Sequence, residues 1–304
     1  MTALIELRGV SKEFGSGVRR TTVALRNVTF TLPDAAPSTT AIAGESGSGK
    51  TTLARMILGF VKPTSGQVFY RGQDLAAMSD TERRRFRREV QPIFQDPFDV
   101  FNPFYRVDHV LTVPIRRFGL AKSRDEARRL IDEALHRVGL RPQDTLGRFP
   151  HELSGGQRQR VMVARAVLLR PKVIMADEPV SMVDASLRMS IVNLLKALRD
   201  DLGVSVIYIT HDLATAYYIS NRLIIMQRGR IVEMGDARTV LENPEHPYSR
   251  LLKASVLSTE DAGAGKLATN PAMVALASRL ATDPGGRLVS RPDGRLVRVY
   301  DDAA

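Results

Sequence analysis

The sequence predicts an α/β fold in which helices cover a mainly parallel sheet. A short β-prone run occurs at residues 39–43, and apolar runs typical of buried strands occur at residues 173–175 and 204–210. Stretches with helical periodicity alternate with these runs, at residues 52–58, 158–170 and 187–198. Such alternation is typical of parallel sheets. A length of 304 residues suffices for one large α/β domain, or for a domain with an appendage.

The regions around this core differ in character. Residues 1–72 are rich in strand candidates, which lie at residues 4–7, 23–32 and 67–70. Residues from about 80 to 150 are instead rich in Arg, Ala and Leu with helical periodicity, most clearly over residues 123–138. Ser123 is followed three residues later by Glu126, which predicts a capping box at the start of that helix.

The last fifty residues have a different composition from the rest of the chain. Residues 255–266 are small and polar and predict a linker, and residues 271–281 predict a short helix. Two β-prone runs, 287–291 and 295–300, flank the turn sequence Pro-Asp-Gly at 292–294. We expect a hairpin there that docks on another element, because an isolated two-stranded hairpin is marginal in water.

The motif with the most chemical content is GESGSGKT at residues 44–51, which fits the phosphate-loop template G-x-x-x-x-G-K-[ST]. Its glycines let backbone N–H groups approach the phosphates, Lys50 supplies a mobile positive charge, and Thr51 supplies a hydroxyl for Mg²⁺. A Gly/Ser-rich turn is the alternative interpretation. The loop lies between a strand candidate and a helix candidate, as phosphate binding requires, and this context favours the phosphate loop.

Polar residues follow two of the predicted core strands. The run 173–176 ends in Asp177 and Glu178, and in a phosphate-loop enzyme the first carboxylate holds Mg²⁺ while the second polarises the attacking water. His211 follows the run 204–210, where it can donate a hydrogen bond to the γ-phosphate or orient the water. Solvated acids at a strand exit and a structural histidine are the alternatives, and the phosphate loop favours the functional interpretation.

Two further segments contain polar groups suited to nucleotide chemistry. Gln95 precedes a Pro-containing loop, and its amide can reach Mg²⁺ or the attacking water while the loop contacts a partner. In LSGGQ at 153–157, the Ser154 hydroxyl and two glycines precede a helix that we expect to start near Gln157, an arrangement that binds anions. A second phosphate site in one chain is redundant unless it serves the nucleotide of another subunit.

The charge balance is strongly basic, with a formal net charge of +11. Such a balance suggests nucleic acid or an anionic membrane surface as a partner. The densest basic cluster, Arg83 to Arg85 with Arg87 and Arg88, is interpreted as a solvated helix face. The aromatic content of 6% without any Trp does not provide the stacking platforms of nucleic-acid binders, so nucleic acid is not expected as a partner.

The composition also excludes some classes of site. The absence of cysteine excludes disulfides and thiolate-bound metals. No apolar stretch approaches the ~20 residues that a membrane-spanning helix needs, and the N-terminus is not typical of a secretory signal.

Taken together, these residues resemble the ATP-binding subunit of an ABC transporter over residues 4–252. The matching positions, in the family's order and spacing, are the phosphate loop, Gln95, Leu153 to Gln157, Asp177, Glu178, Asp184 and His211. The resemblance implies an ATPase that uses ATP and Mg²⁺. It also implies a mixed-sheet core with an antiparallel β subdomain and an α-helical subdomain at about 80–165, followed by a C-terminal extension at 253–304.

The resemblance assigns a role to each matched residue. Catalysis is expected from Glu178, His211 and Gln95, and Mg²⁺ binding from Thr51, Gln95 and Asp177. Phe14 is expected to stack on adenine, with a buried strand-end aromatic as the alternative. The other expected nucleotide contacts are Gly44, Ser46, Gly47, Gly49, Lys50, Thr51, Thr52, Ser154, Gly155, Gly156, Gln157 and Asp184.

The family also implies an assembly. ATP is expected to lie between the phosphate loop of one subunit and Ser154 to Gln157 of the other, in a head-to-tail dimer with Asp184 in the loop that crosses the interface. Three strings resemble oligopeptide and dipeptide importers in particular: FQDPFDVFNP at 94–103, FPHELSGGQRQR at 149–160 and HPYSRLL at 246–252.

In importers of that type, two permease subunits pair with two ATPase chains. The second ATPase is usually a different chain, and a homodimer stays open here. An extracytoplasmic solute-binding protein acts with them indirectly. The implied location is peripheral, on the cytoplasmic face of the inner membrane. Peptides are the expected solute, while nickel chelates and sugars also stay open.

The chain departs from this importer pattern at three places. Val100-Phe101 replaces the usual Ser-Leu, Val180 the usual Thr, and Met182-Val183 the usual Ala-Leu. Two other functions stay open from the sequence. One is a soluble ABC-type ATPase that acts on ribosomes, DNA or protein complexes, and the other is a regulatory module that binds ATP and turns it over slowly.

Overall fold

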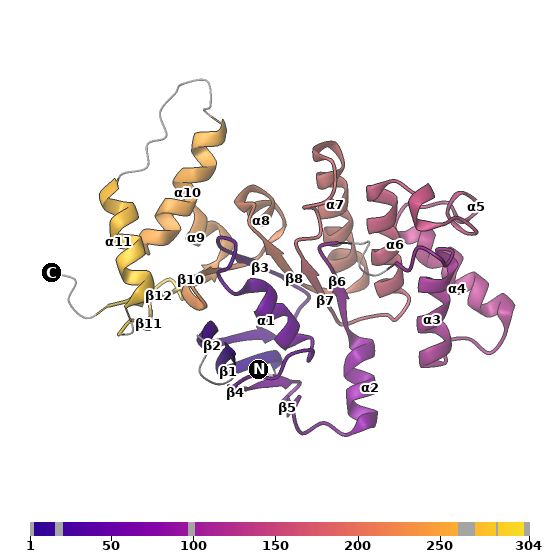
Figure 1. Cartoon of the computed structure of the whole chain (residues 1–304), viewed down its shortest axis with the longest axis horizontal. Coiled ribbons are helices and arrows are strands. Elements are labelled where there is room, and N and C mark those ends of the chain that lie inside the picture. The colour runs from indigo at the N-terminus through magenta and orange to yellow at the C-terminus, as the bar shows by residue number, and fades with distance from the viewer. Residues whose placement is uncertain (1–2, 16–20, 97–100, 261–270, 284, 301–304) are drawn as a thin grey trace. The chain divides into compact units, whose positions relative to one another are not determined.

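The computed structural model describes residues 3–15, 21–96, 101–260, 271–283 and 285–300 (Figure 1). The chain divides into two compact units. The first unit contains residues 1–78 and 208–304, and the second contains residues 79–207. Strand β8 (Ser205–Thr210) crosses the division and is buried along its whole length. Both units combine helices with strands, which confirms the α/β fold class.

An antiparallel sheet forms one part of the first unit. Its strands follow the order β2 (Thr22–Pro33), β1 (Ala3–Phe14), β4 (Ser65–Tyr70) and β5 (Gln73–Asp74). Ile5 of β1 stands opposite Leu32 on one side and Tyr70 on the other. All three side chains are buried, so a continuous cross-strand layer stabilises this sheet. The expected antiparallel β subdomain is therefore present.

A second set of strands in the first unit includes the C-terminal hairpin. Strand β3 (Thr39–Ala43) pairs in parallel with β9 (Arg222–Gln227), which pairs antiparallel with β10 (Arg230–Asp236). The hairpin of β11 (Arg287–Ser290) and β12 (Leu296–Val299) is present where its turn sequence predicts it. It docks through β12 on β10, with Val297 opposite Glu233, so this sheet supplies the partner that an isolated hairpin lacks.

The described residues of the first unit contain five helices: α1 (Lys50–Ile57), α8 (Leu213–Ile219), α9 (Ala237–Glu242), α10 (Pro247–Glu260) and α11 (Pro271–Thr282). Helices α10 and α11 lie side by side (Figure 1). The linker predicted from residue 255 is corrected in part, because α10 continues through residues 255–260. Residues 261–266 of that linker lie outside the described residues.

The second unit is mostly helical around a short parallel pair of strands. Strand β6 (Val90–Ile93) pairs with β7 (Val173–Asp177), whose five residues are all buried. Its helices are α2 (Asp80–Glu89), α3 (Asp108–Phe118), α4 (Arg124–Arg137), α5 (Pro142–Thr145), α6 (Gly155–Val167) and α7 (Ala185–Leu202), with a 3₁₀ turn at Pro150–Glu152. The sequence predicted β7 because a parallel strand that is buried on both faces consists of a continuous run of apolar residues.

The cap of α4 differs from the prediction. The Glu126 N–H donates to the Ser123 hydroxyl at 3.1 Å, as expected of an N-cap. The Glu126 carboxylate, however, accepts a hydrogen bond from the N–H of Lys122 at 2.6 Å, one residue before the cap. The predicted capping box is therefore only half formed, because its reciprocal bond is made to the neighbouring peptide.

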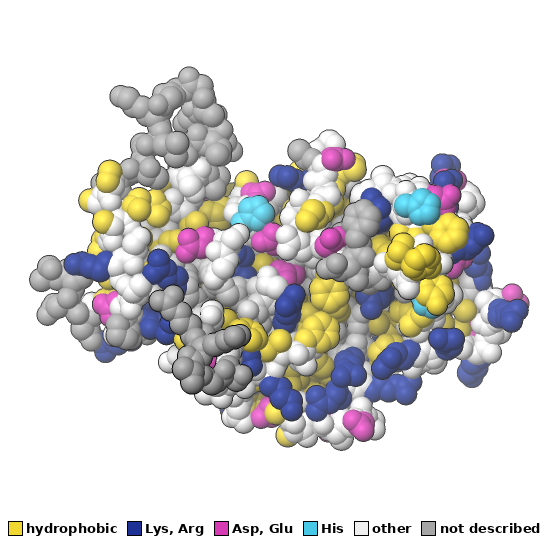
Figure 2. Space-filling view, in the orientation of Figure 1, with side chains coloured by type: hydrophobic (Ala, Val, Ile, Leu, Met, Phe, Trp, Pro, Cys, Tyr) yellow, Lys and Arg dark blue, Asp and Glu magenta, His cyan; other side chains and the backbone are white. Residues whose placement is uncertain are grey.

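The basic cluster forms one face of α2. Arg84, Arg85, Arg87 and Arg88 are exposed, while Phe86 between them is buried. Figure 2 shows Lys and Arg side chains gathered over α2 at the lower edge of the view. This arrangement agrees with the solvated helix face expected from the sequence.

Candidate functional site

The phosphate loop joins β3 to α1 in the first unit, and its backbone is closely packed on one side. A Cβ atom on Gly44 would lie 2.2 Å from the Met226 carbonyl oxygen, and one on Gly49 would lie 2.5 Å from that of Ala24. Gly47 has a φ of 80°, and no described atom lies within 4 Å of the place of its Cβ. The loop therefore has a packed side, where only glycine fits, and an open side that a phosphate can approach.

The amine of Lys50 lies across the loop. Its Nζ donates hydrogen bonds to the carbonyl oxygens of Gly44 at 2.7 Å and Glu45 at 2.8 Å. The residue is only 5% exposed, and a buried ammonium is tolerated only when such partners satisfy its donors. The loop thus holds a positive charge in a fixed place, next to backbone that a phosphate can reach.

Three predicted hydroxyl residues in and after the loop are at least partly exposed, whereas Ser48 is buried. Thr51 is exposed in the first turn of α1, Thr52 beside it is half-buried, and Ser46 is exposed in the loop. The first N–H groups of a helix have no intrahelical acceptor and carry the positive end of its dipole. These residues therefore lie where a phosphate and its metal ion are expected.

Phe14 lies at the end of β1 with 45% of its surface exposed. The Lys12 amine sits 5.1 Å from the centroid of its ring. The alternative of a buried strand-end aromatic is therefore wrong, and the ring has an exposed surface on which an adenine can stack.

His211 follows β8, as predicted, and its side chain is exposed. The residues on either side of it are fixed. The N–H of Asp212 donates to the Thr210 hydroxyl at 2.9 Å, and the Asp212 carboxylate caps α8 by accepting the N–H of Ala214 at 2.9 Å. The imidazole therefore projects from a short, firmly held connection between a buried strand and a helix.

The two adjacent carboxylates lie in the second unit at the end of β7. Asp177 is buried as the last residue of the strand, and Glu178 is half-buried. Glu178 has a φ of 45°, in the left-handed region, although it precedes a proline that favours extended backbone. The Glu178 carbonyl accepts hydrogen bonds from the N–H and the hydroxyl of Ser181, at 3.2 and 3.0 Å, which hold this turn.

A left-handed conformation costs a residue other than glycine about 1–3 kcal/mol. Such residues cluster at active sites, where the rest of the fold enforces a required geometry. Glu178 shares this conformation with Asn27, Arg71, Arg170 and Arg228, and the sequence did not predict it.

Helix α6 begins at Gly155, two residues before the predicted start. The Gln157 N–H donates to the Ser154 hydroxyl at 3.2 Å, and the Ser154 N–H donates to the Gln157 side-chain oxygen at 2.9 Å. This capping box fixes the start of the helix. A Cβ atom on Gly156 would lie 3.0 Å from Cδ1 of Leu187, so this turn packs tightly on α7.

The two remaining predicted residues of the second unit are exposed. Asp184 precedes α7, and its carbonyl accepts the N–H of Leu187 at 2.8 Å. Gln95 lies just after β6. Of the nearby departures from the importer pattern, Phe101 is buried, whereas Val100 lies outside the described residues.

The predicted site residues therefore fall into two groups. The first unit contains Phe14, the phosphate loop and His211, and the second contains Gln95, Ser154 to Gln157, Asp177, Glu178 and Asp184. Among the described residues, no group of three or more His, Cys, Asp or Glu side chains can hold a metal ion by itself. Mg²⁺ commonly takes one or two carboxylates with phosphate and water oxygens, so the residue types present fit it.

Comparison with known proteins identifies the family. Residues 25–181 match the family described as ABC transporter. These residues make up more than half of the chain. They contain the phosphate loop, Gln95, Ser154 to Gln157 and both carboxylates at the end of β7. The chain belongs to the ABC transporter family. This confirms the family resemblance seen in the sequence.

Two relatives are similar to this chain over most of its length. The glutathione import ATP-binding protein GsiA of Salmonella paratyphi A is 42% identical over 259 residues, which cover 83% of this chain and 41% of GsiA. A putative peptide import ATP-binding protein of Brucella ovis is 40% identical over 259 residues, which cover 85% of this chain and 80% of the relative. The chain thus spans about two-fifths of the length of GsiA and four-fifths of the Brucella protein.

A solved ABC cassette supports the fold. The dimeric structure of the ATP-binding cassette MJ0796 in a post-hydrolysis state, bound to ADP and Pi, superposes with a TM-score of 0.69 at 30% identity. The similarity covers 77% of this chain and 99% of that cassette.

Among the described residues, none of the helices combines the length and the apolar character that crossing a membrane requires.

One contact to the phosphate loop was not predicted from the sequence. The N–H of Glu45, in the loop, donates a hydrogen bond to the phenol oxygen of Tyr248 at 2.9 Å. Tyr248 belongs to the string HPYSRLL, which resembles peptide importers but predicted no role for this residue. No local pattern links residues 45 and 248, so only the fold reveals the pair.

Proposed function

We propose that the chain is the ATP-hydrolysing subunit of an ABC importer for short peptides. The observation that carries this proposal is the phosphate loop. Its packed glycines, open face and fixed Lys50 support the binding of a nucleoside triphosphate. The match to the ABC transporter family identifies ATP as the nucleotide.

The remaining predicted residues would complete the chemistry. Thr51, Gln95 and Asp177 would hold Mg²⁺, which neutralises charge on the phosphates when bound. Glu178 would take the proton of the attacking water, and His211 would donate a hydrogen bond to the γ-phosphate or orient that water. The left-handed backbone of Glu178 supports its catalytic role.

We infer that two such cassettes form a head-to-tail dimer. The proposal explains why the chain has a second anion-binding motif, since Ser154 to Gln157 and Asp184 would contact the ATP held by the other cassette. The dimeric structure of MJ0796 supports this arrangement. ATP would drive closure of the dimer only if it binds the closed form more tightly than the open one.

The substrate class rests on the relatives. One is named for glutathione import and another for putative peptide import, and both names fit short peptides. These names also favour an importer over a soluble ATPase acting on ribosomes or DNA. The proposed partners are two permease subunits and a second ATPase, with the extracytoplasmic solute-binding protein acting through the permease. The proposed location is the cytoplasmic face of the inner membrane.

We assign the ATP-binding domain to residues 1–252, with its helical subdomain at about 80–165, and the C-terminal extension to 253–304. The aligned length of 259 residues in both relatives supports a cassette of that size.

The test is co-purification of the tagged chain from gently solubilised native membranes, with the partners identified by mass spectrometry. Recovery of two multi-spanning permeases and a second ATPase is the expected result. Recovery of ribosomes or DNA-bound complexes without a permease would contradict the importer and favour the soluble ATPase.

A further inference from the structure

Tyr248 connects the C-terminal part of the first unit to the phosphate loop. It lies in the first turn of α10 and is 3% exposed. Its phenol oxygen accepts the hydrogen bond from the N–H of Glu45. Burial raises the pKa of the phenol to about 12, so the group stays neutral at any pH the cell meets.

The bond from Glu45 acts on a single peptide unit of the loop. The Glu45 N–H and the Gly44 carbonyl belong to the same planar peptide group. Tyr248 holds the N–H end of that plane, and the Lys50 amine holds its carbonyl end at 2.7 Å. Rotation of this peptide would break both bonds, so Tyr248 fixes the orientation of a carbonyl that in turn positions the Lys50 charge.

The turn that carries Tyr248 is itself fixed by a buried carboxylate. The Tyr248 N–H donates to Nδ1 of His246 at 3.1 Å. The N–H groups of Glu245 and His246 both donate to the carboxylate of Glu233 on β10, each at 3.0 Å. Glu233 is completely buried, and a buried charge is stable only with partners that balance it.

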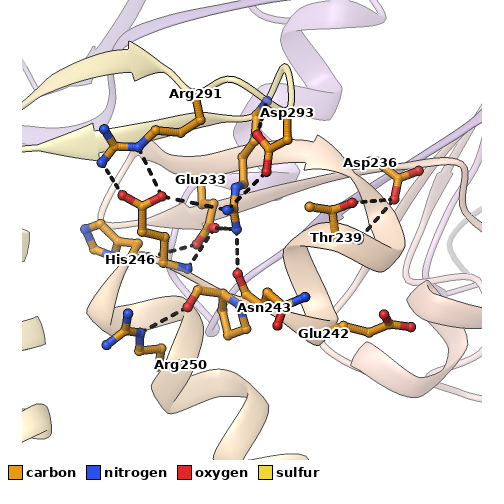
Figure 3. Close-up of polar contacts among 12 residues, drawn as sticks. Glu233, Asp236, Thr239, Glu242, Asn243, His246, Arg250, Arg291 and Asp293 are labelled. Atoms are coloured by element: carbon orange, nitrogen blue, oxygen red, sulfur yellow. Dashed lines mark hydrogen bonds and ion pairs between the residues drawn. The ribbon is translucent and has the colours of Figure 1, made fainter.

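The C-terminal hairpin supplies the balancing charge. The Arg295 guanidinium lies 3.1 Å from the Glu233 carboxylate and also donates to the carbonyl of Asn243. Arg291 of the same hairpin forms an ion pair with Glu245, which precedes His246. Figure 3 shows Glu233, Asn243, His246 and Arg291 gathered in one polar cluster between the hairpin and the start of α10.

We propose that Tyr248 is a positioning residue of the phosphate loop, and that the C-terminal hairpin controls nucleotide affinity through Arg295, Glu233 and Tyr248. The inference rests on the proposed ATP binding. It assigns a role to the hairpin of the C-terminal extension, which the sequence left without one. A partner that displaces the hairpin would thereby weaken ATP binding at the loop.

The test measures ATP affinity and, separately, the thermal stability of the protein without nucleotide. Tyr248→Phe removes only the hydroxyl and is expected to weaken ATP binding about 3- to 10-fold, since one hydrogen bond is lost. The matched control is Tyr217→Phe, whose hydroxyl makes an exposed hydrogen bond of the same length to Glu242 in the same unit. The control is expected to bind ATP like the wild type.

A double-mutant cycle with Arg295→Gln separates positioning from general stabilisation. If Arg295 acts through Tyr248, the double variant loses little more affinity than either single variant. If the fold-losses of ATP affinity in the two single variants multiply in the double variant, the inference is overturned. Unchanged ATP affinity in Tyr248→Phe would also overturn it. Either result would leave ATP binding by the wild type intact. A wild-type protein that binds no ATP would instead overturn the proposed function, and this inference with it.

If Tyr248→Phe does not fold, amide hydrogen exchange at Glu45 gives the same information without nucleotide. Arg295→Gln is expected to speed exchange at Glu45 severalfold relative to the wild type, because the bond to Tyr248 loosens. Equal exchange rates would overturn the proposed connection.

Discussion

Glu178 has a left-handed backbone conformation in front of a proline, at the end of a buried strand. The strand and the two bonds from Ser181 hold this geometry against its local cost. Single residues of this kind, together with the glycines of the phosphate loop, fix the backbone next to the groups proposed to react.

Lys50→Ala should weaken ATP binding about 10- to 100-fold, because a charge-assisted hydrogen bond to phosphate is lost. Binding of ATP to the purified protein by calorimetry measures the effect. Lys62→Ala is the control, since Lys62 is exposed in the same unit and lies outside the loop. Equal ATP affinity of the Lys50 variant and the wild type would show that this loop does not bind the phosphates.

His246 should make stability depend on pH. Burial and the nearby Arg298 charge lower its pKa from 6.5 to about 4. Between these two values the unfolded chain binds a proton that the folded chain does not, so acidification lowers the free energy of unfolding there. Across the whole window the loss amounts to about 3 kcal/mol.

His246→Asn keeps an acceptor for the Tyr248 N–H but removes the titration. Chemical unfolding of both proteins at several pH values between 4 and 6.5 measures the difference, because all other titratable groups are shared. The wild type should lose more stability on acidification than the variant. Parallel curves would contradict the lowered pKa.

At the scale of elements, the sequence predicted what depends on apolar pattern and turn chemistry. Strands β3 and β7 were recognisable because they are buried on both faces, and the hairpin because Pro-Asp-Gly marks its turn. The start of α6 and the start of the linker after residue 254 were placed inaccurately. Both boundaries depend on capping and packing against other elements rather than on composition.

The packing of the phosphate loop gives a prediction for Gly49. A Cβ there would meet the Ala24 carbonyl at 2.5 Å, whereas no described atom lies within 4 Å of the place of a Cβ on Gly72. Both residues have a positive φ, so an alanine is expected to strain the backbone at both positions. Gly49→Ala should therefore lower the free energy of unfolding by about 1–3 kcal/mol more than Gly72→Ala. Thermal unfolding of the two variants compares them, and equal effects would show that the loop has room to relax.

For the whole molecule, the sequence predicted the family, because the family's motifs are local strings, and the site residues taken from the same strings stay a prediction. It did not predict the connection from Arg295 to Glu45, because residues of four separate segments form it. The proposed catalytic residues also come from both compact units.

We propose that the chain hydrolyses ATP with Glu178 as the base. The most direct measurement is phosphate release from ATP with Mg²⁺ by the wild type and by Glu178→Gln, together with ATP binding and light scattering of both. We predict that the variant binds ATP, forms a dimer in its presence, and turns over about 100-fold or more slowly than the wild type. Turnover of the variant at the wild-type rate, or absence of turnover in the wild type, would contradict this claim.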